Sequence, residues 1–278
     1  MIENILIAFL AVASVGIICA VLLALASHFL HVEEDEKTLK IRECLPGVNC
    51  GACGYAGCDD YAKALANDNV KTNLCIPGSD SVAAEIAEIL GVEPEDVIEM
   101  IAHVRCNGNC NVTTKFAHYQ GINSCAAAML VYGGIYDCRY GCLGCGDCEK
   151  VCPSNAICVH NGVAHINNKL CVGCGLCAKA CPKNIIEIFP QVSRVAVMCN
   201  NTLKGAVARK TCKNACIGCK KCESVCPSDA INVENNLAHI DYSKCSNCGK
   251  CAEACPTKCI KLLEIGRASC RERVSPRV

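Results

Sequence analysis

Large aromatic side chains are scarce in this sequence. It contains no tryptophan, and aromatic residues make up only 4% of its 278 positions, while cysteine accounts for part of its 52% hydrophobic content. Aromatic residues normally supply much of the buried area of a protein core. We therefore expect inorganic centres, rather than a large apolar core, to organise much of this fold.

Net charge and several cofactor motifs are absent as well. The 27 basic residues balance the 27 acidic ones, so the overall charge indicates no partner, and nothing predicts nucleic-acid binding. No G-x-G-x-x-G follows a predicted strand, and there is no P-loop and no C-x-x-C-H sequence. The chain is therefore not predicted to bind a dinucleotide in a Rossmann domain, a nucleoside triphosphate or a c-type haem. No residue is predicted to be catalytic.

Cysteine, by contrast, is in excess, at 31 of 278 residues. Such a content usually indicates a disulfide-rich secreted domain. Here the chain is long, the thiols come in close C-x2-C runs, and no cleavable signal peptide is evident. These features favour a reducing compartment and metal-bound thiolates.

A nearly continuous apolar run extends from Ile5 to Leu30. It exceeds the roughly 20 residues that cross a bilayer. A signal peptide is the alternative, but it would need a basic start and a shorter apolar stretch. We predict a retained single-pass membrane anchor. Lys37, Lys40 and Arg42 follow the run and no basic residue precedes it, so the positive-inside rule places the body on the cytoplasmic side of the cell membrane.

Two segments in the second half of the chain repeat each other. The segment that starts at Cys142 recurs, with the same cysteine spacing, 74 positions later at Cys216. Each contains two runs of the form C-x2-C-x2-C-x3-C-P, separated by short β-prone stretches such as 156–159 and 163–166. This run is the bacterial ferredoxin pattern, in which the fourth cysteine binds the cluster of the other run. The sequence therefore predicts two tandem modules with two [4Fe–4S] clusters each.

The ferredoxin pattern assigns four thiolates to each of four sites. They are site 1 (Cys142, Cys145, Cys148, Cys181), site 2 (Cys171, Cys174, Cys177, Cys152), site 3 (Cys216, Cys219, Cys222, Cys255) and site 4 (Cys245, Cys248, Cys251, Cys226). Small residues within the runs are predicted to let backbone N–H groups approach the sulfur atoms, namely Gly144, Gly173, Gly218 and Gly249. Structural zinc usually uses separated pairs of cysteines, so zinc is the weaker interpretation.

Two further cysteine sets have other spacings. The N-terminal site (Cys50, Cys53, Cys58, Cys75) supplies four thiolates for a fifth [4Fe–4S] cluster, with zinc a stronger rival than at sites 1 to 4. The loose set (Cys106, Cys110, Cys125, Cys138) is predicted to hold a sixth cluster, with free buried thiols and zinc as alternatives. Five cysteines complete no set and are predicted to be packing thiols or thiols around a cluster: Cys44, Cys158, Cys199, Cys212 and Cys259.

The predicted fold is α+β, with an N-terminal transmembrane helix, a small helical iron–sulfur domain and two ferredoxin modules. The segment 79–104 has apolar residues at helical spacing and is predicted to form two short helices. The predicted boundaries are 1–31 for the anchor, 32–80 for the N-terminal iron–sulfur domain, 81–138 for a helical linker domain, 139–189 for the first module, 190–213 for a basic linker, 214–263 for the second module and 264–278 for a tail that resembles cloning sequence.

The basic linker includes one predicted strand and a basic loop. No Asp or Glu occurs from Ile188 to Cys222, whereas Lys204, Arg209 and Lys210 lie close together. Small ferredoxins are commonly acidic, so these three residues are candidates for electrostatic docking of reduced ferredoxin beside site 3. The alternative is a solvated loop that only joins the two modules.

An apolar N-terminal span, the sequence CGACGYAGC with Cys75, and two ferredoxin modules together resemble the RnfB family, the B component of the Rnf complex, in its longer clostridial form. The resemblance covers residues 1 to about 263. It implies an ion-translocating ferredoxin–NAD oxidoreductase of the membrane, with partner subunits that bind NADH and span the bilayer. This chain would accept electrons from reduced ferredoxin and pass them to those subunits. The alternatives are a polyferredoxin subunit of another membrane oxidoreductase and a non-catalytic metal-binding redox sensor or adaptor.

Overall fold

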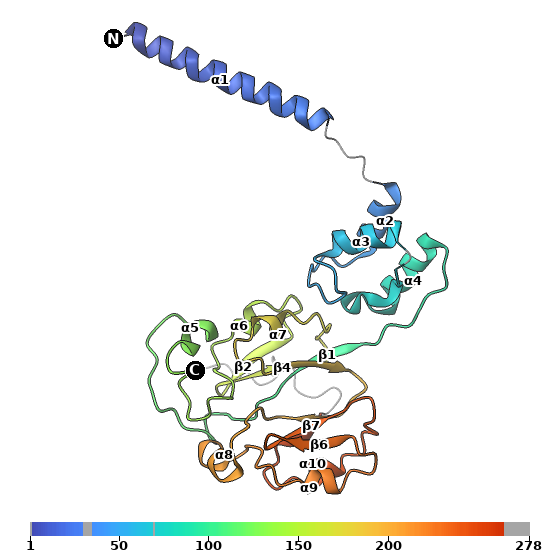
Figure 1. Ribbon diagram of the computed structural model, residues 1–278, viewed down its shortest axis with the longest axis vertical. Helices are drawn as coiled ribbons and strands as arrows, with labels where there is room; N and C mark the ends of the chain where they lie inside the picture. The colour runs from blue at the N-terminus through green and yellow to red at the C-terminus, as the bar shows by residue number, and fades with distance from the viewer. Residues whose placement is uncertain (1, 30–34, 69, 264–278) are drawn as a thin grey trace, which may run out of the picture.

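The computed structural model describes residues 2–29, 35–68 and 70–263. The chain forms one long N-terminal helix, a small helical unit, and a larger body of short helices and two-stranded sheets (Figure 1). The predicted tail over 264–278 lies outside the described residues. The body mixes short helices with antiparallel strand pairs, as an α+β fold does.

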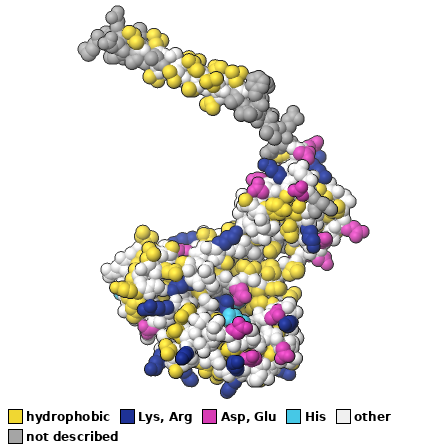
Figure 2. Space-filling view, viewed as in Figure 1, with side chains coloured by type: hydrophobic (Ala, Val, Ile, Leu, Met, Phe, Trp, Pro, Cys, Tyr) yellow, Lys and Arg dark blue, Asp and Glu magenta, His cyan; other side chains and the backbone are white. Residues whose placement is uncertain are grey.

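The N-terminal helix α1 covers Ile2–Phe29 and extends away from the rest of the chain (Figure 1). Its described side chains are mostly exposed and apolar; Ile7, Phe9 and Leu23 have exposed fractions of 65%, 70% and 71%. Figure 2 shows hydrophobic side chains along this helix. Over the described residues, no helix combines the length and the hydropathy of a membrane span.

The helical unit follows. Its elements are α2 (Glu36–Cys44), α3 (Cys58–Asn67), the 3-10 turns η1 (Thr72–Leu74) and η2 (Ile76–Gly78), and α4 (Ser79–Leu90). Ile41, Tyr61 and Ile86 form its buried centre, each at 1% exposure or less. The last helix ends at Gly91, whose φ of +70° is the left-handed conformation that glycine adopts without strain.

The segment after Gly91 corrects one prediction. The first expected helix of 79–104 is α4, but the second is the strand β1 (Met100–Val104). This strand pairs antiparallel with β4 (Ile186–Pro190), and its Ile101 and Val104 are buried. Because β1 completes a sheet of the first module, pairing to a strand far along the chain overrides the helical spacing of its apolar residues.

The two modules have the same plan. The first contains α6 (Asp147–Lys150), β2 (Ile157–His160), β3 (Val163–Ile166), α7 (Leu176–Ala180) and β4, and the second contains α9 (Lys221–Ser224), β6 (Ile231–Glu234), β7 (Leu237–Ile240), α10 (Lys250–Ala254) and β8 (Ile260–Leu262). In each, a hairpin joins the two cysteine runs, and these hairpins confirm the predicted β-prone stretches. The last strand of each module pairs with a strand from before its first cysteine run, β1 in the first module and β5 (Val195–Val197) in the second.

Two short helices lie in the connecting segments. They are α5 (Cys125–Met129), which precedes the first module, and α8 (Gly205–Thr211), between the modules. The strand predicted in the basic linker is present as β5, but much of the expected loop is the helix α8. Its Ala208 is fully buried, while Arg209 and Lys210 are exposed, so the helix packs through its small residue and presents its basic ones to solvent.

Candidate iron–sulfur sites

The four cysteines of the N-terminal site meet at one cavity of the helical unit. This cavity has a volume of about 320 Å³, and all four residues line it. Burial first, and then the three neighbouring thiols, raises the pKa of the Cys75 thiol to about 11. The loop before α3 is held by Asn49, whose Oδ1 accepts a 2.8 Å hydrogen bond from the N–H of Cys58. Four convergent thiols around one cavity can hold a [4Fe–4S] cluster.

Site 2 lies directly beside the N-terminal site. The Nζ of Lys179, on α7, donates a 2.6 Å hydrogen bond to the carbonyl oxygen of Cys50. Burial raises the pKa of the Cys174 thiol, and Cys50 is among the thiols near enough to raise it further. Gly173 also approaches the helical unit closely, because a Cβ there would lie 3.1 Å from Cγ2 of Ile76 in η2. The helical unit is therefore seated on the loop of site 2.

The first module brings together both of its predicted sets. In site 2, burial raises the pKa of Cys177 to about 12, with further increases from Cys171, Cys174 and Cys152. In site 1, three of the thiols line a cavity of about 340 Å³, and the fourth, Cys145, lies close to Cys142. Both sets draw cysteines from the two runs, as the ferredoxin pattern predicts.

The second module also brings together both of its predicted cysteine sets. All four cysteines of site 4 line a cavity of about 320 Å³. In site 3, Cys216 and Cys219 lie near Cys222, and Cys255 lies near Cys216. Cys219 of site 3 and Cys248 of site 4 are exposed, so both sites reach the protein surface.

Backbone N–H groups point at the sulfur atoms in these sites. The N–H of Ala156 donates to Cys152 Sγ at 3.3 Å, and the equivalent N–H of Ala230 donates to Cys226 Sγ at the same distance. Hydrogen bonds of this kind stabilise thiolates and tune the clusters they bind. The convergent thiols, the cavities and the N–H donors fit [4Fe–4S] clusters.

The loose set is not brought together. Cys106 and Cys138 line one cavity of about 380 Å³, and Cys110 and Cys125 are not among its lining residues. Cys110 is exposed, and its N–H is bound to the carbonyl oxygen of Asn161 in the β2–β3 turn. Cys125, at the start of α5, lines the cavity of site 1. The irregular spacing of these four cysteines does not predict how they are arranged in space. In the structure Cys110 and Cys125 lie apart from the cavity that Cys106 and Cys138 share.

Two cysteines outside the predicted sets lie where Cys110 and Cys125 were expected, beside Cys106 and Cys138. Cys199 and Cys212 are buried and line the same cavity as Cys106 and Cys138. No spacing rule links cysteines so far apart in sequence, so the sequence alone could not predict that these four lie together. Of the others, Cys44 donates to the carbonyl oxygen of Lys40, and Cys259 is buried beside site 3.

A chain that gathers cysteines in this way, in tandem ferredoxin modules, is a multicluster iron–sulfur protein of the electron-transfer type. Family models match it as "Putative Fe-S cluster" over 45–77 and as "4Fe-4S dicluster domain" over 141–185 and 215–262, with a further dicluster match over 170–232. These matches support an iron–sulfur cluster in the N-terminal segment and [4Fe–4S] clusters in the two modules.

Curated relatives identify the family. The chain is 41% identical to the B component of the Na⁺-translocating ferredoxin:NAD⁺ oxidoreductase complex of Acetobacterium woodii, over 88% of this chain and 74% of the relative. It is 45% identical to the B component of the proton-translocating ferredoxin:NAD⁺ oxidoreductase complex of Clostridium ljungdahlii, over 83% and 82%. It is 36% identical to the B component of the ion-translocating oxidoreductase complex of Methanosarcina acetivorans, over 90% and 95%. The chain belongs to the RnfB family, the B components of these Rnf complexes.

Proposed function

We propose that this chain accepts electrons from reduced ferredoxin and passes them to the NAD-reducing, ion-translocating subunits of an Rnf complex. The names of the relatives support this activity, and the absence of any dinucleotide motif from the sequence fits NADH chemistry elsewhere in the complex. The observation that carries the proposal is the seating of the N-terminal site on site 2 through Lys179 and Cys50.

The N-terminal site and sites 1 to 4 each hold one cluster in this proposal, with the cysteines named above as ligands. A bound [4Fe–4S] cluster supplies reversible one-electron transfer. The chain positions the thiolates, directs N–H groups at their sulfur atoms and surrounds them with buried apolar side chains. These groups set the reduction potential through hydrogen bonding and burial, so no side chain has to act as an acid or a base.

The helix α1 is the single-pass anchor in this proposal, and the iron–sulfur body faces the cytoplasm. Support comes from its 28 residues, its exposed apolar side chains and the basic residues that follow it, Lys37, Lys40 and Arg42. A helix of this length spans about 42 Å at 1.5 Å per residue, more than the roughly 30 Å of a bilayer core.

Ferredoxin docks at α8 in this proposal. Lys204, Arg209 and Lys210 are exposed, and Figure 2 shows Lys and Arg side chains over this end of the body. Gly205, the first residue of α8, packs against the loop of site 3, because a Cβ there would lie 2.5 Å from the carbonyl oxygen of Ile217. The basic helix therefore lies against the ligand loop whose Cys219 is exposed.

The test is rapid mixing of the anaerobically purified complex with reduced ferredoxin. We expect the visible absorbance of the clusters in this chain to bleach at least as fast as NAD⁺ is reduced. Bleaching slower than NAD⁺ reduction would show that the electrons bypass this chain. That result would favour a redox sensor or adaptor.

A further inference from the structure

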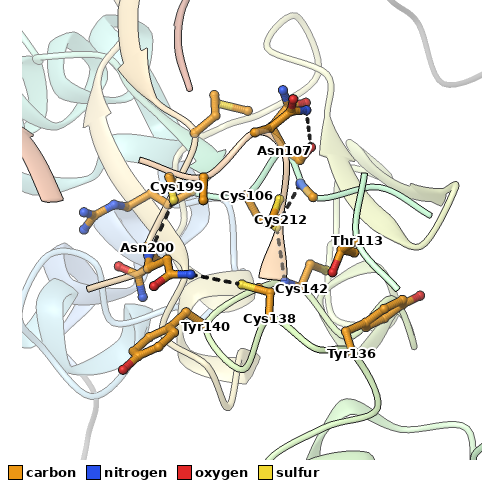
Figure 3. A pocket seen from close by; sticks show the side chains of 17 residues that line it. Cys106, Asn107, Thr113, Tyr136, Cys138, Tyr140, Cys142, Cys199, Asn200 and Cys212 are labelled. Carbon is orange, nitrogen blue, oxygen red and sulfur yellow. Dashed lines mark hydrogen bonds between the residues drawn. The ribbon is translucent and has the colours of Figure 1, made fainter. Parts of the chain in front are cut away.

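A further cysteine-lined cavity lies between the two ferredoxin modules, and its lining includes residues that directly precede the first cysteine run of each module. Figure 3 shows Cys106, Cys138, Cys199 and Cys212 around it. These four thiols come from three separate loops and from the end of α8, and none belongs to a ferredoxin run.

We propose that Cys106, Cys138, Cys199 and Cys212 form a sixth site, the central site, and that it binds a [4Fe–4S] cluster. Four thiolates suffice for one such cluster. The central site replaces the loose set, of which it keeps Cys106 and Cys138.

Hydrogen bonding at the central site matches that of the ferredoxin sites. Cys106 Sγ accepts from the N–H of Gly108 at 3.4 Å and from the N–H of Cys142 at 3.3 Å. Cys199 Sγ accepts from the N–H of Asn201 at 3.5 Å and from the N–H of Cys216 at 3.2 Å. Backbone donors aimed at sulfur in this way stabilise a thiolate, which is the form that binds iron.

The Cys138 thiol has a side-chain donor. The Nδ2 of Asn201 lies 3.7 Å from Cys138 Sγ, and Asn201 is only 1% exposed. Its side chain is also held by a 2.8 Å hydrogen bond from the N–H of Leu203 to its Oδ1. A buried amide fixed in this orientation gives the third thiol the hydrogen bond that backbone groups give to the first two.

Two glycines line the cavity beside its sulfur atoms. A Cβ at Gly108 would lie 3.4 Å from Cys212 Sγ and 3.5 Å from Cys106 Sγ, and a Cβ at Gly141 would lie 3.4 Å from Cys106 Sγ. These are ordinary contact distances, so the backbone at both positions runs directly past the thiols.

The position of the central site suggests its role, which rests on the function proposed above. Two of its sulfur atoms accept N–H groups from Cys142 and Cys216, the first cysteines of sites 1 and 3. These two residues are equivalent in the repeat. The central site therefore touches both modules at matching points, and we assign it the electron connection between them.

Cluster counting tests the site without any substitution. Native mass spectrometry of the anaerobically purified full chain should show six [4Fe–4S] clusters, and chemical analysis should give about 24 irons at four per cluster, with no zinc. Five clusters with four free thiols, or one zinc per chain, would overturn the proposal. Zinc is the specific rival because it also binds four thiolates.

Substitutions then locate the sixth cluster. Cys199→Ala and Cys212→Ala should each leave five clusters, or about 20 irons. Cys110→Ala is the matched control and should keep all six, because Cys110 is exposed and outside the cavity. Six clusters in both test variants would overturn the assignment. The count on the unsubstituted chain decides the question even where a substitution impairs folding.

The connecting role has its own readout. In complexes that contain Cys212→Ala, reduced ferredoxin should bleach the clusters of one module quickly, while those of the other module remain oxidised. Equal bleaching of both modules would contradict the connection and leave the proposed function intact. Failure of the proposed function would instead appear in the unsubstituted complex, which ferredoxin would not reduce.

Discussion

The Nζ of Lys179 and the carbonyl oxygen of Cys50 are joined by a 2.6 Å hydrogen bond across 129 positions of sequence. One residue lies on a helix of the first ferredoxin module, and the other is the first ligand candidate of the N-terminal site. The bond fixes two thiol sets side by side. Removing this hydrogen bond therefore tests the contact between the helical unit and the body.

Lys179→Met should loosen this contact. A hydrogen bond from a charged donor contributes about 1.5–3 kcal/mol, and we expect the lower end, or less, because Lys179 is exposed. Hydrogen exchange in residues 45–57 should rise several-fold, while the iron content stays at the parental value. Lys169→Met is the control, since Lys169 is an exposed lysine of the same module. Equal exchange in both variants would mean that Lys179 does not hold the helical unit.

Gly173→Ala should abolish the cluster of site 2. Gly173 has a φ of +64°, and a Cβ there would lie 2.3 Å from the carbonyl oxygen of Met100, a backbone atom of β1 that cannot move aside cheaply. Gly175→Ala is a matched control, because its φ of +74° carries the same strain but no atom lies within 4 Å of its Cβ. The control should lose about 1–2 kcal/mol of stability and keep its iron. Gly173→Ala should lose about four irons per chain, and equal iron in the two variants would show that the close approach is unimportant.

Charge reversal at α8 tests the docking of ferredoxin. Changing Lys204, Arg209 and Lys210 to Glu should slow electron uptake at low ionic strength and flatten its salt dependence, because exposed charges are screened beyond roughly 8 Å at 0.15 M. Stopped-flow reduction across a salt series measures both effects.

The control for that variant reverses three exposed lysines away from α8, Lys63, Lys71 and Lys169, which gives the same change in net charge. It should keep the parental rate and salt dependence. If the control variant takes up electrons slowly while the α8 variant keeps the parental rate, the entry point lies at the N-terminal site and not at α8.

Removal of residues 1–30 tests the anchor. We expect a brown protein in the soluble fraction with unchanged iron per chain, because the described core of the helical unit begins after α1, at Ile41. Sedimentation of cell extracts that lack the partner subunits gives the readout. A truncated chain that still sediments with these membranes would rule out α1 as the only means of attachment.

The sequence predicted the parts of the fold that depend on local spacing. The spacing within the ferredoxin runs predicted sites 1 to 4, because each ligand loop needs only a few adjacent residues and a proline after the fourth cysteine. The β-prone stretches between the runs predicted both hairpins. It missed what long-range packing decides. The strand β1 has apolar residues that suit a helix, and only its pairing with Ile186–Pro190 makes it a strand. Cys199 and Cys212 lack a run altogether, so their meeting with Cys106 depends on how the two modules pack.

The final prediction concerns a fifth thiol at site 3. Cys259 is 1% exposed, and its Sγ lies 3.6 Å from Cys255 Sγ. Either sulfur can donate in this hydrogen bond, and hydrogen bonding with Cys259 lowers the pKa of the Cys255 thiol to about 4 and that of the Cys216 thiol to about 6. If Cys255 and Cys216 bind iron as thiolates, Cys259 is the thiol that keeps a proton to donate. The first module has Ile185 at the equivalent position, 74 residues earlier, and so lacks this donor.

A donor to ligand sulfur stabilises negative charge and therefore favours the reduced cluster. Cys259→Ala should lower the reduction potential of site 3 without loss of iron, and Cys259→Ser, which keeps a donor, should restore most of it. Redox titration followed by electron paramagnetic resonance separates this signal from the other clusters. Loss of about four irons in Cys259→Ala would instead make Cys259 a ligand, and an unchanged potential would leave it as a packing residue between Cys216 and Cys255.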